Sequence, residues 1–179
     1  MKFSSNRITR VIVFLCIFLM LLFALCAFIG IRFNTTNSIP IGFYRIVHMP
    51  IEKGAYVIFC PPENNVFNEA QKRGYISAGF CKGGYGYMMK RVAAVKGDSV
   101  FISKEGVFVK GKLLPVSKPV IADAAGRPMF RYPFHTFTLK EGEFLLMSDI
   151  SGTSFDGRYF GPINRAQIKG VIHSIFTWK

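Results

Sequence analysis

The chain has 179 residues and a formal net charge of +13, from 23 Lys and Arg against 10 Asp and Glu. This length accommodates one domain of roughly 100–150 residues with short appendages, which excludes a multidomain assembly. The basic residues are scattered and form no long run, so we expect anionic lipid headgroups and no nucleic acid as the partner of the positive charge.

Residues 11–31 form an apolar stretch without a charge, VIVFLCIFLMLLFALCAFIGI. A helix rising about 1.5 Å per residue would extend about 31 Å over this stretch, close to the ~30 Å hydrocarbon core of a bilayer. We therefore predict a transmembrane helix at 11–31, preceded by a cytoplasmic tail at 1–10. A cleavable signal peptide with its small-residue site at 24–27 is the alternative, although its apolar region is usually about 7–15 residues long.

Positive charges are concentrated before this span. Lys2, Arg7 and Arg10 precede it, whereas Arg32 alone follows it closely. Cytoplasmic flanks carry the excess of Lys and Arg, so we expect the N-terminus in the cytoplasm and residues 32–179 on the far side. In a bacterium this is a single-pass inner-membrane protein with a periplasmic domain and the lipid bilayer as its first partner.

The segment that follows the span contains the first candidate for chemistry, TNSIPIGFY at 36–44. Pro40 fixes its own φ and holds Ile39 extended, while Gly42 permits a sharp bend. The hydroxyl of Ser38 is thus displayed on stiff backbone near the bilayer surface. This segment is either a juxtamembrane turn or the site of a nucleophile, and a serine nucleophile requires a base.

Two cysteines bracket the next elements. Residues 56–60 are typical of a strand ended by prolines, 66–75 of a short helix, and 79–86 of a flexible turn. Cys60 and Cys81 form an even pair in an oxidising compartment, so we predict that they are joined by a disulfide.

The rest of the chain has the pattern of short strands separated by turns. Strands are expected at 87–95, 99–103, 106–109, 113–114, 144–147 and 171–176, with a loop at 121–133. We find no long amphipathic helix after the span. The predicted fold is an all-β (β-rich) domain at 32–179 on a single N-terminal transmembrane helix.

A base for Ser38 can be sought among the histidines and lysines. His48, His135 and His173 are far apart in sequence and stand in no recognisable triad setting, and we expect no metal site. Lys90 interrupts an apolar strand and is the better candidate.

Alternation along that strand puts Lys90 and Arg91 on opposite faces, so one of them should point inward. Burial favours the neutral form of a lysine, which is the form that can accept a proton. The alternative is that both are surface charges on an edge strand.

A Gly- and Ser-rich loop at 148–162 carries the spaced residues Ser154, Asp156 and Arg158. Residues two apart in an extended chain share one face, so we expect Asp156 to pair with Arg158 and Ser154 to extend the network. A plain solvated loop is the alternative.

Together, segments 38–40 (SIP), 90–92 (KRV) and 148–158 (SDISGTSFDGR) resemble the signature boxes of the type I signal peptidase (S26) family of membrane-bound serine proteases. Their order, their spacing and their position after an N-terminal span agree with this family, as does the hairpin at 107–114. The resemblance implies the family's signal-peptidase-like catalytic domain.

Other features are similar to the conjugative-transfer branch of that family. These are the small size, the single span and the sequences NSIPIG at 37–42 and RYFGP at 158–162. This branch includes peptidases that mature pilin subunits.

The resemblance implies a Ser/Lys dyad in which Ser38 is the nucleophile and Lys90 is the general base. It places the oxyanion hole at the backbone N–H of Ser38 and the hydroxyl of Thr36. It also implies three supporting residues, namely Ser154 to orient the lysine, and Asp156 and Arg158 as an ion pair.

We therefore expect a membrane-anchored serine endopeptidase that needs no cofactor and cleaves an exported precursor at the membrane surface through an acyl-enzyme. A pilin precursor is the leading substrate, and the product is either linear or cyclic. The alternatives are a general type I signal peptidase that removes signal peptides and a non-catalytic component of pilus or secretion assembly.

Overall fold

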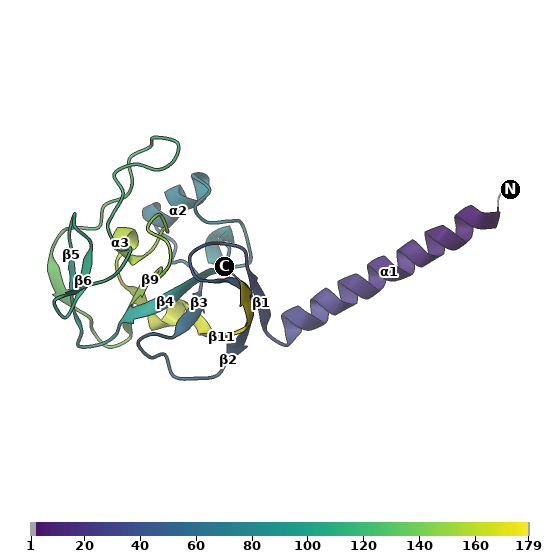
Figure 1. The fold of residues 1–179 in the computed structure, drawn as a ribbon, viewed down its shortest axis with the longest axis horizontal. Helices are drawn as coiled ribbons and strands as arrows, with labels where there is room; N and C mark the ends of the chain where they lie inside the picture. The colour runs from purple at the N-terminus through teal and green to yellow at the C-terminus, as the bar shows by residue number, and fades with distance from the viewer. Residues whose placement is uncertain (1–2, 179) are drawn as a thin grey trace.

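A computed structural model describes residues 3–178, and Lys2 of the predicted tail lies outside them. One long helix, α1 (Phe3–Phe28), projects away from a β-rich domain that contains the rest of the chain (Figure 1). Within α1, the segment Asn6–Cys26 is long and apolar enough to cross a membrane, and none of it is buried against the domain. This is consistent with a single-pass anchor or a signal sequence.

The helix does not have the predicted limits of 11–31. It begins earlier, within the predicted tail, and its last backbone hydrogen bond runs from Ile29 N to Leu25 O at 2.9 Å. Gly30 then adopts a φ of +81°, which a glycine tolerates and which turns the chain out of the helix. Ile31 already begins the first strand. The limits differ because the apolar sequence indicates which residues can lie in a bilayer, whereas the backbone conformation at Gly30 determines where the helix ends.

The domain is built on a seven-stranded antiparallel sheet in the order β1-β2-β11-β3-β4-β9-β10. Its strands are β1 (Ile31–Asn34), β2 (Ile41–Val47), β3 (Tyr56–Phe59), β4 (Met88–Ala94), β9 (Glu143–Met147), β10 (Ile163–Asn164) and β11 (Ile168–Trp178). The last strand, β11, lies between β2 and β3, where Val171 pairs with Val47 on one side and Val57 on the other.

A smaller antiparallel sheet has the order β7-β6-β5-β8. Its strands are β5 (Ser99–Ile102), β6 (Val107–Val109), β7 (Lys112–Leu113) and β8 (Thr136–Thr138). The helical elements of the domain are short: α2 (Asn65–Lys72), α3 (Gly157–Phe160) and the 3₁₀ turns η1 (Lys82–Gly84) and η2 (Arg165–Gln167). The predicted β-rich domain is confirmed.

Within the described residues, buried apolar side chains form three clusters. The largest includes Phe67 of α2 and packs that helix against the large sheet. A second contains Val100 and Leu145 and joins the small sheet to β9. The third contains Ile39 and Ile58 and lies beneath the loop that precedes β2. Burial of apolar side chains is the main favourable term in folding, so this third cluster fixes the backbone next to Ser38.

The strands expected from apolar runs are all present within about two residues of their predicted limits, apart from β11, which is longer at both ends. Strands β1, β2, β8 and β10 were not predicted. The segment of β1 and β2 is interrupted by Arg, Pro and Gly, and β10 contains only two residues, so neither shows a strand pattern.

The turn at 79–86 was predicted to be flexible, and the structure corrects this. It contains η1, and its backbone is closed by hydrogen bonds from Cys81 N to Tyr85 O at 2.9 Å and from Gly86 N to Ser77 O at 2.6 Å. A disulfide joins Cys81 to Cys60. The turn is therefore held both by its own backbone and by a covalent link to the end of β3.

Candidate active site

Ser38 lies in the loop that connects β1 to β2. The two strands pair in register up to Asn34 opposite Gly42, so the intervening residues form a short closed loop. The side chain of the next residue, Ile39, is completely buried in the cluster beneath the loop. The backbone is not extended here as the sequence predicted, because Ser38 lies in a turn, and its side chain is only partly buried.

Lys90 reaches the serine from β4. The strand alternates as its sequence predicts: Lys90 is 3% exposed, whereas the side chain of Arg91 is 48% exposed. Lys90 pairs with Val57 of β3 and projects from the sheet toward the β1–β2 loop. Its Nζ donates a hydrogen bond to Ser38 Oγ at 2.6 Å. The two residues of the expected dyad are thus in direct contact, although 52 positions separate them in sequence.

The surroundings of Lys90 change its acidity. The pKa of Lys90 is lowered from 10.5 to about 8: burial is the main cause, the negative charge of Asp156 opposes it, and the positive charge of Arg158 adds to it. An amine with this pKa is neutral in about half of the molecules at pH 8. The neutral amine has a free lone pair and can accept the proton of Ser38.

Ser154 supplies a second contact to the nucleophile. Its hydroxyl lies 3.1 Å from Ser38 Oγ, and either oxygen can be the donor. The family resemblance assigns Ser154 to orienting the lysine. The recorded hydrogen bond of its hydroxyl is with Ser38, so Ser154 restrains the rotamer of the serine, and its role toward the lysine stays a prediction.

Asp156 and Arg158 form a buried ion pair whose side chains are both completely inaccessible. Two parallel hydrogen bonds join them, from Nε to Oδ1 and from Nη2 to Oδ2, each at 2.8 Å. The guanidinium also donates to Gly152 O at 2.7 Å and to Lys118 O at 3.2 Å. Asp156 Oδ2 accepts the backbone N–H of Ser148 at 3.0 Å. The pair therefore clamps the loop that carries Ser154.

The pairing of Asp156 with Arg158 was predicted, but the extended backbone assumed for both residues holds only for Asp156, because Arg158 lies in the helix α3. Asp156 is the N-cap of α3, and its Oδ1 accepts the backbone N–H of Arg158 at 3.2 Å. A carboxylate is a strong N-cap because it satisfies a free N–H of the first helical turn. The side chains meet because Arg158 lies in that first turn.

Thr36 lines the same cavity as Ser38, and its hydroxyl is already engaged in a hydrogen bond. Its hydroxyl donates to Asn34 Oδ1 at 3.0 Å. Asn34 is 4% exposed and is the last residue of β1. Sequence reasoning did not identify Asn34, because nothing distinguishes a single Asn at the end of a strand that was itself not predicted.

A cavity of about 450 Å³ opens beside Ser38 and provides room for a substrate. The predicted loop at 121–133 forms one wall. In that loop, Asp123 accepts hydrogen bonds from the Tyr75 hydroxyl at 2.5 Å and from Arg127 Nε at 2.7 Å. The bond from Tyr75, together with Arg127, holds the pKa of the Asp123 carboxyl well below its usual range. The cavity is lined by Thr36, Asn37, Ser38, Tyr75, Val120, Ala122, Asp123, Ala124, Met129, Ser151, Thr153, Ser154 and Phe155.

A second polar network joins β3, β4 and the end of β9. Tyr56 donates its hydroxyl proton to Asp149 Oδ2 at 2.7 Å, and Arg91 Nη1 lies 3.5 Å from the same oxygen. Burial and the nearby Asp149 carboxylate raise the pKa of Tyr56. Arg91, the outward residue of the Lys-Arg pair, therefore connects the strand that carries the base to the loop that carries Ser154.

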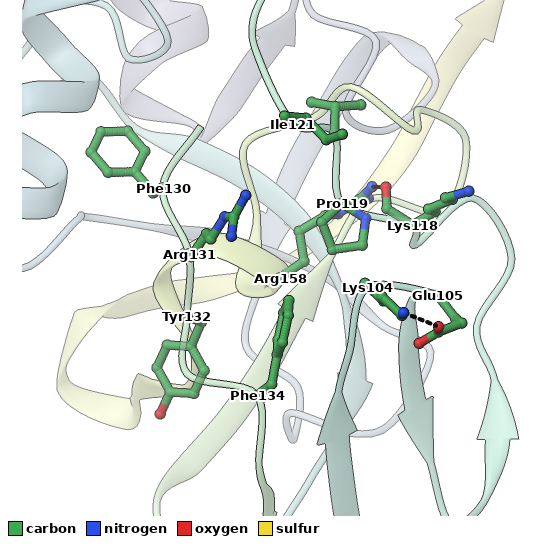
Figure 2. Close-up of a pocket in the computed structure, with 11 residues that line it drawn as sticks. Lys104, Glu105, Lys118, Pro119, Ile121, Phe130, Arg131, Tyr132, Phe134 and Arg158 are labelled. Atoms are coloured by element: carbon green, nitrogen blue, oxygen red, sulfur yellow. Dashed lines mark hydrogen bonds and ion pairs between the residues drawn. The ribbon is translucent and has the colours of Figure 1, made fainter. Parts of the chain in front are cut away.

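Another cavity, of about 530 Å³, lies away from the dyad (Figure 2). Figure 2 shows the aromatic side chains of Phe130, Tyr132 and Phe134 along one irregular segment of the chain, with Lys104 and Glu105 on a different segment. This cavity shares Val120 with the first one but includes neither member of the dyad. The smaller cavity, which contains Ser38, is the candidate active site.

The histidine alternative is not supported by the geometry. His48, His135 and His173 are all exposed, and none lines the cavity beside Ser38. Among residues 3–178, no group of three or more His, Cys, Asp or Glu side chains is placed to hold a metal ion.

Comparison with known proteins identifies several relatives. The chain is 62% identical over 149 residues to a plasmid transfer protein TraF of Escherichia coli, covering 83% of this chain and 84% of that protein. It is 40% identical over 151 residues to a probable conjugal transfer protein TraF of Sinorhizobium fredii, covering 83% and 78% of the two chains. It is 34% identical to the conjugal transfer protein TraF of Agrobacterium fabrum, with 83% and 84% covered.

A crystal structure of a signal peptidase I from Enterococcus faecalis aligns with a TM-score of 0.40 at 18% identity, covering 71% of this chain and 99% of that one. The family described as signal peptidase, peptidase S26, matches residues 5–178. With nearly the whole chain matched and TraF proteins of plasmid and conjugal transfer among its relatives, the chain belongs to the signal peptidase family, peptidase S26.

Proposed function

We propose that this chain is a serine endopeptidase in which Ser38 is the nucleophile and Lys90 is the general base. One observation carries the proposal: Lys90 Nζ lies 2.6 Å from Ser38 Oγ, and the amine is buried with its pKa lowered to about 8. A serine hydroxyl is a weak nucleophile unless an adjacent base removes its proton. The contact and the lowered pKa together provide that base near neutral pH.

In the first step, neutral Lys90 accepts the proton of Ser38 while Oγ attacks the scissile carbonyl carbon. The backbone N–H of Ser38 and the hydroxyl of Thr36 are the donors expected to stabilise the resulting oxyanion. The Thr36 hydroxyl must first turn away from Asn34, where it points in the free enzyme. Protonated Lys90 then donates its proton to the leaving amine, and an acyl-enzyme remains on Ser38.

In the second step, neutral Lys90 removes a proton from water, and the resulting hydroxide attacks the ester carbonyl of the acyl-enzyme. Collapse of the second tetrahedral intermediate breaks the bond to Oγ, and Lys90 returns the proton to Ser38. Asp156, Arg158 and Ser154 act by holding the loop beside the dyad. An amine can replace water in this step, in which case the acyl group is transferred to form a new amide.

The enzyme would act at a membrane surface, with the apolar part of α1 in the bilayer, the residues before it in the cytoplasm and the β-rich domain exported. Two features support this placement. The apolar part of α1 is unburied, and the domain exposes an aromatic cluster next to it. We call this the aromatic belt; it consists of Phe33, Phe43, Phe176 and Trp178, and the Phe33 and Phe43 rings stack with their centroids 4.8 Å apart.

The substrate we propose is a pilin precursor of a conjugative transfer system. The naming of the relatives as plasmid or conjugal transfer proteins supports this choice. The precursor would be held in the same bilayer, so that its cleavage site reaches the cavity beside Ser38. Mass spectrometry of the mature pilin then distinguishes the two products, because a cyclic subunit lacks one water relative to the linear cleaved chain.

The decisive experiment replaces each member of the dyad. Ser38→Ala and Lys90→Ala are each expected to lower precursor processing by at least about 10³-fold, because either change removes the activated nucleophile. Both proteins should remain folded and membrane-bound. Lys96→Ala is the matched control, since that lysine is exposed and pairs with Glu141 on the surface.

Each alternative has its own outcome in this assay. Near-normal processing by Ser38→Ala or Lys90→Ala removes the dyad assignment and favours a non-catalytic assembly component. Unchanged pilin together with cleavage of signal-peptide-bearing preproteins by the unmodified chain would instead identify a general signal peptidase.

A further inference from the structure

The backbone of the serine loop is organised around one side chain, that of Asn34. Its Nδ2 donates to Thr36 O at 2.8 Å, to Ile39 O at 2.9 Å and to Pro40 O at 3.1 Å. These carbonyls lie on both sides of Ser38 in the sequence. A single amide group therefore connects the start of the loop to its end.

The oxygen of the same amide is also occupied. Asn34 Oδ1 accepts the backbone N–H of Thr36 at 3.2 Å and the Thr36 hydroxyl at 3.0 Å. Asn34 is 4% exposed, so water has little access to replace these bonds. A buried carbonyl or N–H that loses its partner is destabilised, so the loop has a strong preference for this conformation.

We propose that Asn34 is a positioning residue for the nucleophile, acting through the backbone of the loop. This inference rests on the proposed function, in which Ser38 is the nucleophile. By holding the carbonyls of Thr36 and Ile39, Asn34 keeps Ser38 Oγ at 2.6 Å from Lys90 Nζ. It also orients Thr36, whose hydroxyl leaves Asn34 Oδ1 for the oxyanion while its backbone N–H stays bound.

The chemistry of the amide explains why an asparagine is suited to this position. Three carbonyl oxygens converge on Nδ2, so the group there must be a donor, whereas the Thr36 N–H and O–H require an acceptor. Aspartate has the same shape but places a second oxygen against the carbonyls. Glutamine keeps both groups on a stem that is longer by one methylene. Alanine removes both groups.

The test uses the full-length chain reconstituted in lipid vesicles with the pilin precursor as substrate. The variants are Asn34→Asp, Asn34→Ala and Asn34→Gln, and the control is Thr35→Ala, an exposed neighbour in the same loop. The initial rate is divided by the concentration of folded enzyme, determined by circular dichroism and gel filtration. This division separates positioning from simple loss of folded protein.

We expect Asn34→Asp and Asn34→Ala to lower kcat about 10²-fold, since displacement of a reacting group by about 1 Å has an effect of this size. KM should change by less than about threefold, because Asn34 itself does not line the cavity. The pH midpoint of the rate should stay at the value of the unmodified enzyme, because Lys90 remains buried. The kcat of Asn34→Gln should lie between the values of these variants and that of the unmodified chain. The kcat of Thr35→Ala should equal that of the unmodified chain.

Unchanged kcat per folded molecule in Asn34→Ala would overturn the inference, as would a loss that appears only in KM or only in the folded fraction. If Asn34→Asp does not accumulate in folded form, Asn34→Gln decides the question by its kcat alone. The proposed function is tested separately in the same vesicles. If Ser38→Ala retains activity, the assignment of the dyad is wrong. If Ser38→Ala loses activity while Asn34→Ala keeps full activity, only the role of Asn34 is rejected.

Discussion

At the scale of single residues, the site depends on one lysine that is buried next to a hydroxyl. Burial of Lys90 is the main cause of its lowered pKa, and Arg158 adds to the effect while Asp156 limits it. The same Asp156 is bound in two hydrogen bonds by Arg158, so much of its charge is compensated within the ion pair. The ion pair therefore holds the structure of the site without restoring Lys90 to its ordinary acidity.

The first prediction concerns the pH dependence of processing. Because the pKa of Lys90 is lowered to about 8, the neutral fraction should increase about tenfold between pH 7 and pH 9 and then level off. Single-turnover cleavage of the precursor at controlled ionic strength measures this profile. Lys90→Arg should show no such rise, because a guanidinium does not lose its proton in this range. A profile that is flat from pH 5 to pH 10 in the unmodified enzyme contradicts a lysine base.

The second prediction concerns stability. The pKa of Lys90 is about 8 in the folded protein and about 10.5 in the unfolded chain, so folding disfavours its protonated form. The penalty is fully present below pH 8, decreases as the pH rises through 8–10.5, and is absent above that range. We expect the inactive variant Lys90→Met to increase the free energy of unfolding by about 1–3 kcal/mol at pH 7.

This gain should shrink at pH 10, where most of the unmodified lysine is already neutral in the folded state. Urea unfolding at pH 7 and pH 10 measures the difference in free energy of unfolding at each pH. Lys96→Met is the control at an exposed lysine. A variant that is less stable than the unmodified chain at pH 7 would show that Lys90 contributes more by its contacts than it loses by burial.

At the scale of elements, the sequence predicted the parts that follow a regular pattern. The strand that contains Lys90 alternates in burial, so the inward position of one of its two basic residues could be inferred before the structure was known. The β1–β2 hairpin could not be predicted from the sequence, because its loop is organised by hydrogen bonds between the side chain of Asn34 and the backbone. The contact of Ser154 with Ser38 likewise could not be predicted from the sequence, because the two residues are 116 positions apart and only the complete fold brings them together.

The third prediction concerns the disulfide, which joins the end of β3 to the turn before β4 across 21 positions. Replacing both Cys60 and Cys81 by Ser should lower the free energy of unfolding by about 3 kcal/mol, on the chain-entropy estimate for a loop of this size. Denaturant unfolding measures the change. The free cysteines Cys16 and Cys26 of α1 provide the control, because their replacement by Ser should leave the domain unaffected.

The disulfide lies outside the cavity beside Ser38, so the double variant should keep its kcat at temperatures where it remains folded. Equal stability with and without the disulfide would show that backbone hydrogen bonds alone hold the 79–86 turn.

At the scale of the whole molecule, the β-rich domain contains the candidate site, and the long helix α1 extends away from it. None of the three buried clusters includes a residue of α1, so the domain is not expected to need the helix for its folding. The aromatic belt lies next to the end of α1, and it includes Trp178, a residue type that is enriched at the interface between lipid and water. The helix and the belt together are suited to hold the loop of Ser38 near a bilayer.

The fourth prediction follows from this division. A chain without residues 1–28 should fold and should cleave a soluble peptide substrate with unchanged kcat. Its processing of a precursor anchored in vesicles should fall about 10²-fold, because the shared membrane no longer raises the effective concentration of enzyme and substrate. An unrelated transmembrane helix fused in place of α1 should restore the rate. Failure of that fusion to restore it would show that α1 recognises the precursor directly.

The central place of β11 in the large sheet has a consequence for biogenesis. This strand, which comes last along the chain, separates β2 from β3 and pairs with both. Without β11 in place, the hairpin that carries Ser38 and the strand that carries Lys90 are not joined through the sheet, so the two side chains are not brought together. If Ser38 and Lys90 form the proposed dyad, the peptidase would become active only after the last strand of the domain has taken its place in the sheet.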